Sequence, residues 1–162
     1  RKLGGGVVHE LSHEIDYALH FFGKPDKISC EMRKYSDLDI DVEDNAEIRF
    51  YYNSKVVNIH LDFCAKPANL GFMIQCKNGI VKADFVKRKL FVERVGKEEE
   101  INVDIENFSQ LYQEQLRFLN RLVNRENQRD IKECDISQGL EVMKMIKYCQ
   151  ESNEKCTIVE VK

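Results

Sequence analysis

Residues 9–13 read His-Glu-Leu-Ser-His and fit H-E-x-x-H, the pattern of zinc proteases. In that pattern two histidines one helical turn apart bind zinc, and the glutamate activates the zinc-bound water. A third ligand is also needed. The position six after His13, where an extended pattern has histidine, holds Leu19, and the region where a second helix could supply a glutamate reads as a strand around Glu31. A zinc hydrolase therefore remains only as an alternative.

The same segment also suits proton transfer. Apolar residues at i, i+3, i+4 and i+7 predict one straight helix after the glycines, ending at Gly23. On its opposite side Glu10, His13 and Asp16 follow one another at i, i+3 spacing. A carboxylate beside a histidine orients the ring, which suits acid–base catalysis near neutral pH. The alternative is a solvated polar face. The polar band contains His9, Glu10, His13, Asp16, Tyr17 and His20.

The remaining elements follow from residue periodicity. Alternation of apolar and polar residues predicts strands, and Asn78-Gly79 is a strong hairpin signal. Two helices are predicted near the end, the second capped by Asp135 or Ser137. Helix, hairpins, two helices and a closing strand predict an α+β fold: an open, mostly antiparallel β-sheet with helices packed on one face. The predicted strands span 27–33, 46–52, 57–63, 72–75, 80–85, 89–95, 99–103 and 157–161.

Composition bounds the function classes. The 162 residues are 43% hydrophobic and 33% charged with a net charge of −3, so we expect one domain, residues 1–162, that binds neither nucleic acid nor membrane. No apolar run reaches the roughly 18 residues of a membrane span. The six cysteines form no C-x-x-C, which favours free thiols and a cytoplasmic location.

The segment GGGVVHELSHEIDYALHFFGKP resembles the start of the main helix in the C-terminal domain of the glucose–fructose oxidoreductase / inositol dehydrogenase / rhizopine catabolism (Gfo/Idh/MocA) family. Members of this family read G-G-G-x-x-x-D-x-x-x-H-x-x-D and end the helix at a Gly-x-Pro turn. DVEDNAEIRFYYNSKVVNIHLDF and CKNGIVKADF are similar to the sheet region and hairpin that follow, and residues 108–161 to the closing helices and strand. The resemblance covers nearly the whole chain.

The resemblance implies a two-domain NAD(P)-dependent dehydrogenase. An N-terminal Rossmann domain, absent from this chain, would hold NAD or NADP, and this chain would be the substrate-binding and oligomerisation domain. Hydride would pass between nicotinamide and a hydroxyl carbon of a sugar, polyol or nucleotide sugar, while a lysine of a Glu-Lys-Pro motif and a histidine handle the proton. The chain has neither G-x-G-x-x-G nor Glu-Lys-Pro, so alone it is expected to be inactive.

The family's functional residues are matched to this sequence one position at a time. His13 matches the family histidine and is the acid–base candidate; Asp16 matches the aspartate three residues later. Glu10 stands where aspartate is usual, with two residues rather than three before His13, and is the second catalytic candidate. Asp16 and Tyr17, from the polar band, are candidates for substrate binding. We assign no metal ligand.

Further expectations concern the sheet. His60 and Asp62 share one strand face by alternation and are added as substrate-binding candidates, with ordinary sheet-surface residues as the alternative. An antiparallel sheet with helices on one face leaves the other face open, and family members commonly pair sheet to sheet, so we expect a homo-oligomer. The nonstandard spacing of Glu10 supports a further alternative, a catalytically inactive binding or scaffold relative.

Overall fold

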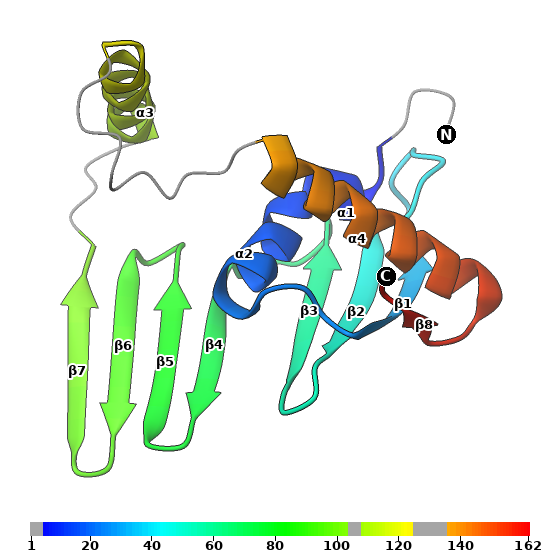
Figure 1. Ribbon diagram of the computed structural model, residues 1–162, viewed down its shortest axis with the longest axis horizontal. Helices are drawn as coiled ribbons and strands as arrows, with labels where there is room; N and C mark the ends of the chain where they lie inside the picture. Colours follow the sequence, from blue (N-terminus) through cyan, green and yellow to red (C-terminus); the bar gives the residue numbers. More distant parts are fainter. Residues whose placement is uncertain (1–4, 104–107, 125–135) are drawn as a thin grey trace. The chain divides into compact units, whose positions relative to one another are not determined.

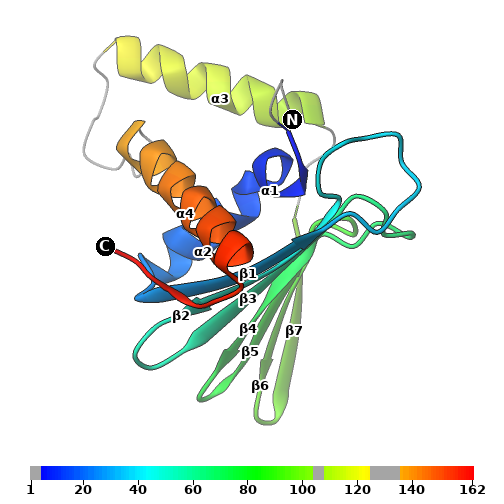
Figure 2. The same ribbon diagram turned by 90° about the vertical axis from the view of Figure 1, so that its right-hand side faces the viewer.

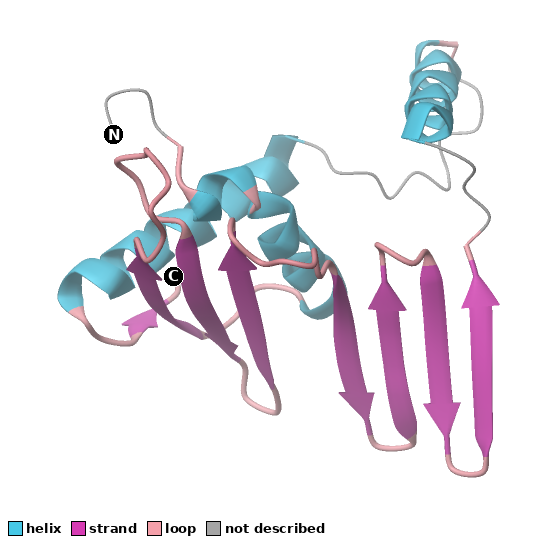
Figure 3. Cartoon of the chain, turned by 180° about the vertical axis from the view of Figure 1, so that it is seen from behind, coloured by secondary structure: helices cyan, strands magenta, loops and turns pink. Residues whose placement is uncertain are grey.

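The computed structural model describes residues 5–103, 108–124 and 136–162. The chain forms two compact units, 1–64 with 133–162 and 65–132. Figure 3 shows the helices and strands of both units. That residues 1–162 act as one domain stays a prediction.

The first unit contains α1 (Val7–Glu10), α2 (Ser12–Phe22), β1 (Lys27–Arg33), β2 (Asn45–Tyr51), β3 (Val56–Asp62), α4 (Ile136–Lys155) and β8 (Val159–Glu160). The second contains β4 (Gly71–Cys76), β5 (Gly79–Asp84), β6 (Lys89–Arg94), β7 (Lys97–Asn102) and α3 (Phe108–Val123).

The first unit is a four-stranded antiparallel sheet in the order β3-β2-β1-β8. Figures 1 and 2 show α2 and α4 on the same face of this sheet. Ile48 lies opposite Cys30 of β1 on one side and Ile59 of β3 on the other. The predicted α+β fold, an open antiparallel sheet with helices on one face, is confirmed.

The core lies between this sheet and its helices. Alternate residues of each strand point toward the helices, because side chains in a strand change face at every residue. Ile15 of α2 and Phe50 of β2 are fully buried. The strands and α4 also contribute Ile28, Cys30, Ala46, Ile48, Ile59, Leu61, Val142, Met145, Ile146, Cys149 and Val159.

Helix α4 also completes the outer edge of β1, where β8 pairs only with Lys27 and Ile28. Beyond that point the backbone N–H of Cys30 donates to Ser152 Oγ at 2.9 Å, and that of Met32 donates to Asn153 Oδ1 at 2.8 Å. Side chains near the end of α4 thus satisfy backbone donors of β1 that β8 does not pair with.

Asp44 organises the loop between β1 and β2. Its side chain is 1% exposed, and its carboxylate accepts hydrogen bonds from the backbone N–H groups of Tyr35 (2.8 Å) and Ser36 (2.9 Å) and from the Ser36 hydroxyl. Its backbone N–H donates to Arg33 O at 3.1 Å, and its carbonyl accepts from Phe63 N at 3.0 Å. The Ser36 hydroxyl and the Tyr35 amide hold the pKa of Asp44 below its ordinary value.

Asp44→Asn is expected to lower the melting temperature at neutral pH by about 5 °C, because an amide cannot accept the same hydrogen bonds from Tyr35 and Ser36. A folded-state pKa below the ordinary 3.8 stabilises the protein above that pH, and the contribution is lost as pH falls through the lowered pKa. Circular dichroism melts at neutral and acid pH measure both effects. Asp37→Asn, an exposed position in the same loop, is the control; equal melting temperatures for the two variants would contradict the assignment.

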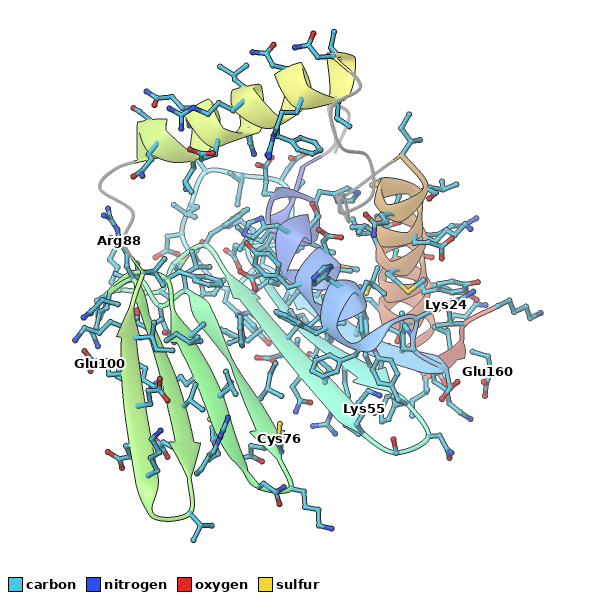
Figure 4. All side chains as sticks on the ribbon, turned by 60° about the vertical axis from the view of Figure 1, so that its left-hand side comes forward. Lys24, Lys55, Cys76, Arg88, Glu100 and Glu160 are labelled. Carbon is cyan, nitrogen blue, oxygen red and sulfur yellow. The ribbon has the colours of Figure 1, made fainter. Side chains whose placement is uncertain are left out.

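The C-terminal end of α2 is hydrogen-bonded to the β2–β3 hairpin. Gly23 has φ 74° and donates its N–H to Leu19 O at 2.8 Å, a helix end that glycine adopts easily. The Tyr52 hydroxyl donates to Gly23 O at 2.8 Å, and Lys55 Nζ lies 4.8 Å from the Tyr52 ring centroid. Figure 4 labels Lys55 at this hairpin. Burial and then the charge of Asp26 raise the pKa of Tyr52 to about 12.

The second unit contains an antiparallel sheet in the order β4-β5-β6-β7. One face of it is apolar: Phe72, Ala83, Leu90 and Ile101 lie opposite one another across the four strands. Ile74, Val81 and Val92 form a second row on the same face. The hairpin predicted at Gly79 is confirmed.

The five cysteines in the described residues are free thiols. Cys30 and Cys149 are buried together between β1 and α4, and hydrogen bonding to Cys30 together with burial raises the pKa of the Cys149 thiol. A raised pKa disfavours the reactive thiolate form of Cys149, and both thiols form part of the buried core. None of the described helices combines the length and apolar character that crossing a membrane requires.

Candidate functional site

The helix predicted after the glycines is broken, and the expectation of one straight helix is wrong. Leu11 has φ −102° and ψ 28°, outside the helical region, so α1 ends at Glu10 and α2 begins at Ser12. Leu11 N donates to Val7 O four residues back, but Glu14 N donates to Leu11 O only three residues back. Glu10 and His13 therefore belong to different helices.

The glycines before α1 have a local structural role. Gly5 and Gly6 have φ of 98° and 101°, a region that other residues rarely adopt. Val7 N donates to Glu43 O at 3.0 Å, and the Glu43 carboxylate lies where a Cβ at Gly6 would stand. Glycine at position 6 thus allows the β1–β2 loop to approach the start of α1.

His13, the acid–base candidate of the sequence, is accessible to solvent. Its side chain on α2 is 46% exposed, and its Nε2 lies 3.6 Å from Glu14 Oε1. The Tyr17 ring, one turn along α2, meets the imidazole edge to face with ring centroids 6.0 Å apart. His13 therefore combines access for a substrate with a neighbouring carboxylate, an arrangement that can accept or donate a proton.

Glu14 is the carboxylate that the sequence analysis missed. Its side chain is only 15% exposed, and burial raises the pKa of its carboxyl group, opposed by the charge of His13. Burial, followed by the charges of Glu14 and Asp16, raises the pKa of Tyr17. A sequence signal existed, because Glu14 lies one turn before the buried Ala18 and hence at the edge of the apolar stripe.

The predicted partners of His13 lie in different places. Asp16 and Tyr17 lie with His13 on α2 and are half-buried. Glu10 is exposed at the end of α1, beyond the break at Leu11. The structure therefore groups His13 with Asp16 and Tyr17 on one helix and assigns Glu10 to another.

His60 and Asp62 lie on the open face of the sheet. Glu47 Oε1 of β2 lies 2.6 Å from His60 Nδ1, and Asp62 Oδ2 lies 3.9 Å from His60 Nε2. Their neighbours Ile59 and Leu61 point to the opposite face, which α2 covers. The structure thus does not bring His60 and Asp62 together with His13, and their contact with a substrate stays a prediction.

The part of the chain that the structure describes fits neither a metal ion nor a dinucleotide pyrophosphate. Among residues 5–103, 108–124 and 136–162, no group of three or more His, Cys, Asp or Glu side chains could hold a metal ion. A dinucleotide pyrophosphate needs glycine backbone amides at the start of a long helix. Here Gly6 precedes a helix of four residues and faces the Glu43 carboxylate, so these glycines do not fit a pyrophosphate.

Solved structures share this fold at low sequence identity. UDP-N-acetylglucosamine 3-dehydrogenase GnnA from Acidithiobacillus ferrooxidans matches with a TM-score of 0.76 and 19% identity, over 96% of this chain and 49% of its own. The WlbA dehydrogenase from Bordetella pertussis, in complex with NADH and UDP-GlcNAcA, matches with a TM-score of 0.69 and 16% identity, over 98% of this chain and 46% of its own. Levoglucosan dehydrogenase, in complex with NADH and L-sorbose, matches with a TM-score of 0.76 and 13% identity, over 93% and 49%.

The chain thus spans about half the length of the solved structures that it matches. No protein with a curated description matches it. The family model for the "Oxidoreductase family, C-terminal alpha/beta domain" matches residues 1–161, almost the full length. The chain therefore belongs to the Gfo/Idh/MocA oxidoreductase family and corresponds to its C-terminal α/β domain.

Proposed function

We propose that this chain is the substrate-binding part of an NAD(P)-dependent dehydrogenase that acts on a hydroxyl carbon of a sugar, polyol or nucleotide sugar. The observation that carries the proposal is His13, an accessible imidazole beside a largely buried carboxylate on α2. The substrates named for the similar dehydrogenases, UDP-N-acetylglucosamine and levoglucosan, support a sugar-like substrate class.

The chemistry divides between cofactor and protein. When an alcohol is oxidised to a carbonyl, its carbon loses a hydride and its hydroxyl loses a proton. NAD or NADP, held outside the described residues, would take the hydride. His13 would take the proton through a ring nitrogen, with Asp16 and Tyr17 placed on the same helix to hold neighbouring hydroxyl groups of the substrate. Glu10 remains a second catalytic candidate from the end of α1.

The test is an assay of the protein expressed from the complete reading frame that contains this chain. Nicotinamide absorbance is followed with NAD and with NADP against a panel of sugars, polyols and nucleotide sugars. Turnover is expected with at least one substrate, whereas the 162-residue chain alone should give none. Absence of turnover with every substrate and both cofactors would reject the proposal and favour an inactive binding relative.

We also propose that a second copy of the protein covers an open sheet face. Support comes from the second unit, where Phe72, Ile74, Val81, Leu90 and Val92 form an apolar face that is only half-buried among the described residues. A contiguous apolar face that is still partly exposed is typical of a protein–protein contact. Light scattering should give a mass of at least two chains; a monomer at all concentrations would exclude this assembly.

A further inference from the structure

Two buried polar atoms of the first unit have no hydrogen-bond partner among the described residues, and both lie near His13 in the sequence. They are His9 Nδ1 and Glu14 Oε1. A buried oxygen without a partner costs free energy, so such a group calls for a physical explanation. Glu14 offers one, because its unpaired oxygen is the atom that faces the His13 ring.

The distance between the two groups is informative. At 3.6 Å, Glu14 Oε1 and His13 Nε2 are too far apart for a hydrogen bond but close enough for a charge interaction when the ring is protonated. Nε2 is the ring nitrogen paired with Glu14, which leaves Nδ1, the other ring nitrogen, for a different partner. Hydrogen bonds of catalytic groups are often long before substrate binds and tighten afterwards.

We propose that Glu14 is the positioning carboxylate of His13: it holds the Nε2 side of the ring, stabilises the imidazolium formed when His13 takes a proton, and leaves Nδ1 for the substrate hydroxyl. The proposal rests on the proposed function and deepens it, because it assigns to Glu14 the role that the sequence pattern suggested for Glu10. The reason is burial. The charge of the largely buried Glu14 carboxylate is less screened by water than that of the exposed Glu10 carboxylate.

A positioning role gives a physical reason for a carboxylate at a costly position. Because burial raises the pKa of Glu14 above its ordinary 4.5, this group stabilises the fold fully below that pH, and its contribution is lost as pH rises through the raised folded-state pKa. At neutral pH the ionised Glu14 is therefore a liability for stability. A residue that lowers stability where the protein works is typical of a functional site.

The first experiment measures the Glu14 titration directly. Carboxyl-carbon NMR on the 162-residue chain should give a Glu14 pKa above 4.5, and His13→Asn should raise it further, because the positive ring no longer favours the carboxylate. His20→Asn, an exposed histidine on the same helix, is the matched control and should leave the Glu14 titration unchanged. If His13→Asn leaves the Glu14 pKa unchanged, the pairing is wrong.

The second experiment separates positioning from structure. In the protein from the complete reading frame, Glu14→Gln should lower kcat by about 10-fold or more, a part of the roughly 10²- to 10⁴-fold that a positioned acid–base group contributes. The same variant should melt at an equal or higher temperature at neutral pH, since an ionised buried group is removed. Glu154→Gln, an exposed carboxylate on α4, should change neither quantity.

The outcomes are distinguishable. Loss of kcat together with a lower melting temperature would assign Glu14 a structural role and overturn the proposal, as would a Glu14→Gln variant with wild-type kcat. If the complete protein oxidises none of the substrates, the proposed function fails, and the NMR titration alone decides whether Glu14 and His13 are coupled. A titration that responds to His13→Asn supports the pairing in either case.

Discussion

His13→Asn in the protein from the complete reading frame is expected to lower kcat by about 10²- to 10⁴-fold, the usual contribution of a positioned general acid–base group. Asparagine keeps a polar side chain of similar reach but cannot take up a proton near neutral pH. The melting temperature should change little, because the His13 side chain is 46% exposed and lies outside the apolar core. Steady-state kinetics and thermal melts measure the two quantities.

The control for this variant is His20→Asn. His20 is also on α2 and exposed. Within the described residues it forms no ion pair with a carboxylate, and it has no assigned role. Its replacement should leave kcat unchanged. If His13→Asn also retains wild-type kcat in an active enzyme, His13 takes no part in proton transfer, and Glu10 becomes the acid–base candidate to test next. An effect on KM alone would assign His13 to substrate binding rather than to proton transfer.

The strands of the first unit could be predicted because their periodicity and burial agree. Ala46, Ile48 and Phe50 alternate with charged residues in the sequence, and these three side chains are buried while Glu47 and Arg49 are exposed. With one face covered by helices, a shift of one residue would expose the whole apolar set, so the pattern determines the register. The fold class followed from such elements.

Helix α4 shows where the pattern was insufficient. Leu140 and Met143 of α4 are apolar but 55% and 52% exposed, whereas Met145 and Cys149 are fully buried. The helix carries two apolar stripes, and hydrophobicity alone does not tell which one faces the sheet. Contacts distant in the sequence decide it, such as the hydrogen bond from Cys30 N to Ser152.

The candidate site was only partly predictable for a related reason. The sequence identified His13, Asp16 and Tyr17 as neighbours on one helix, and the structure has all three on α2. It paired His13 with Glu10 on the assumption of ideal helical geometry, which the backbone at Leu11 does not follow. Burial of Glu14 depends on packing that no local spacing reveals, so the carboxylate nearest the ring was missed.

Phe50→Ala is expected to destabilise the first unit by about 3–5 kcal/mol, a large part of the roughly 5–15 kcal/mol that usually stabilises a domain. Phe50 is fully buried near the end of β2, opposite Ile28 of β1 and Val57 of β3. Alanine would leave a cavity that the two flanking strands, held by their ladders, cannot fill. The urea midpoint should therefore fall by about 2 M. Since the chain has no tryptophan, helical circular dichroism is the appropriate signal.

Phe21→Ala tests whether burial, rather than loss of an aromatic ring, causes this effect. Phe21 lies on α2 and is 46% exposed, so the same substitution removes the same atoms from a site already in contact with water. Its cost should be about 1 kcal/mol, because little apolar surface is returned to solvent. Equal losses for the two variants would contradict the assignment of Phe50 to the core. A large loss of unfolding free energy for Phe50→Ala alone would show that burial of this side chain stabilises the sheet. Because α2 packs on that sheet, the position of His13 depends on the same core.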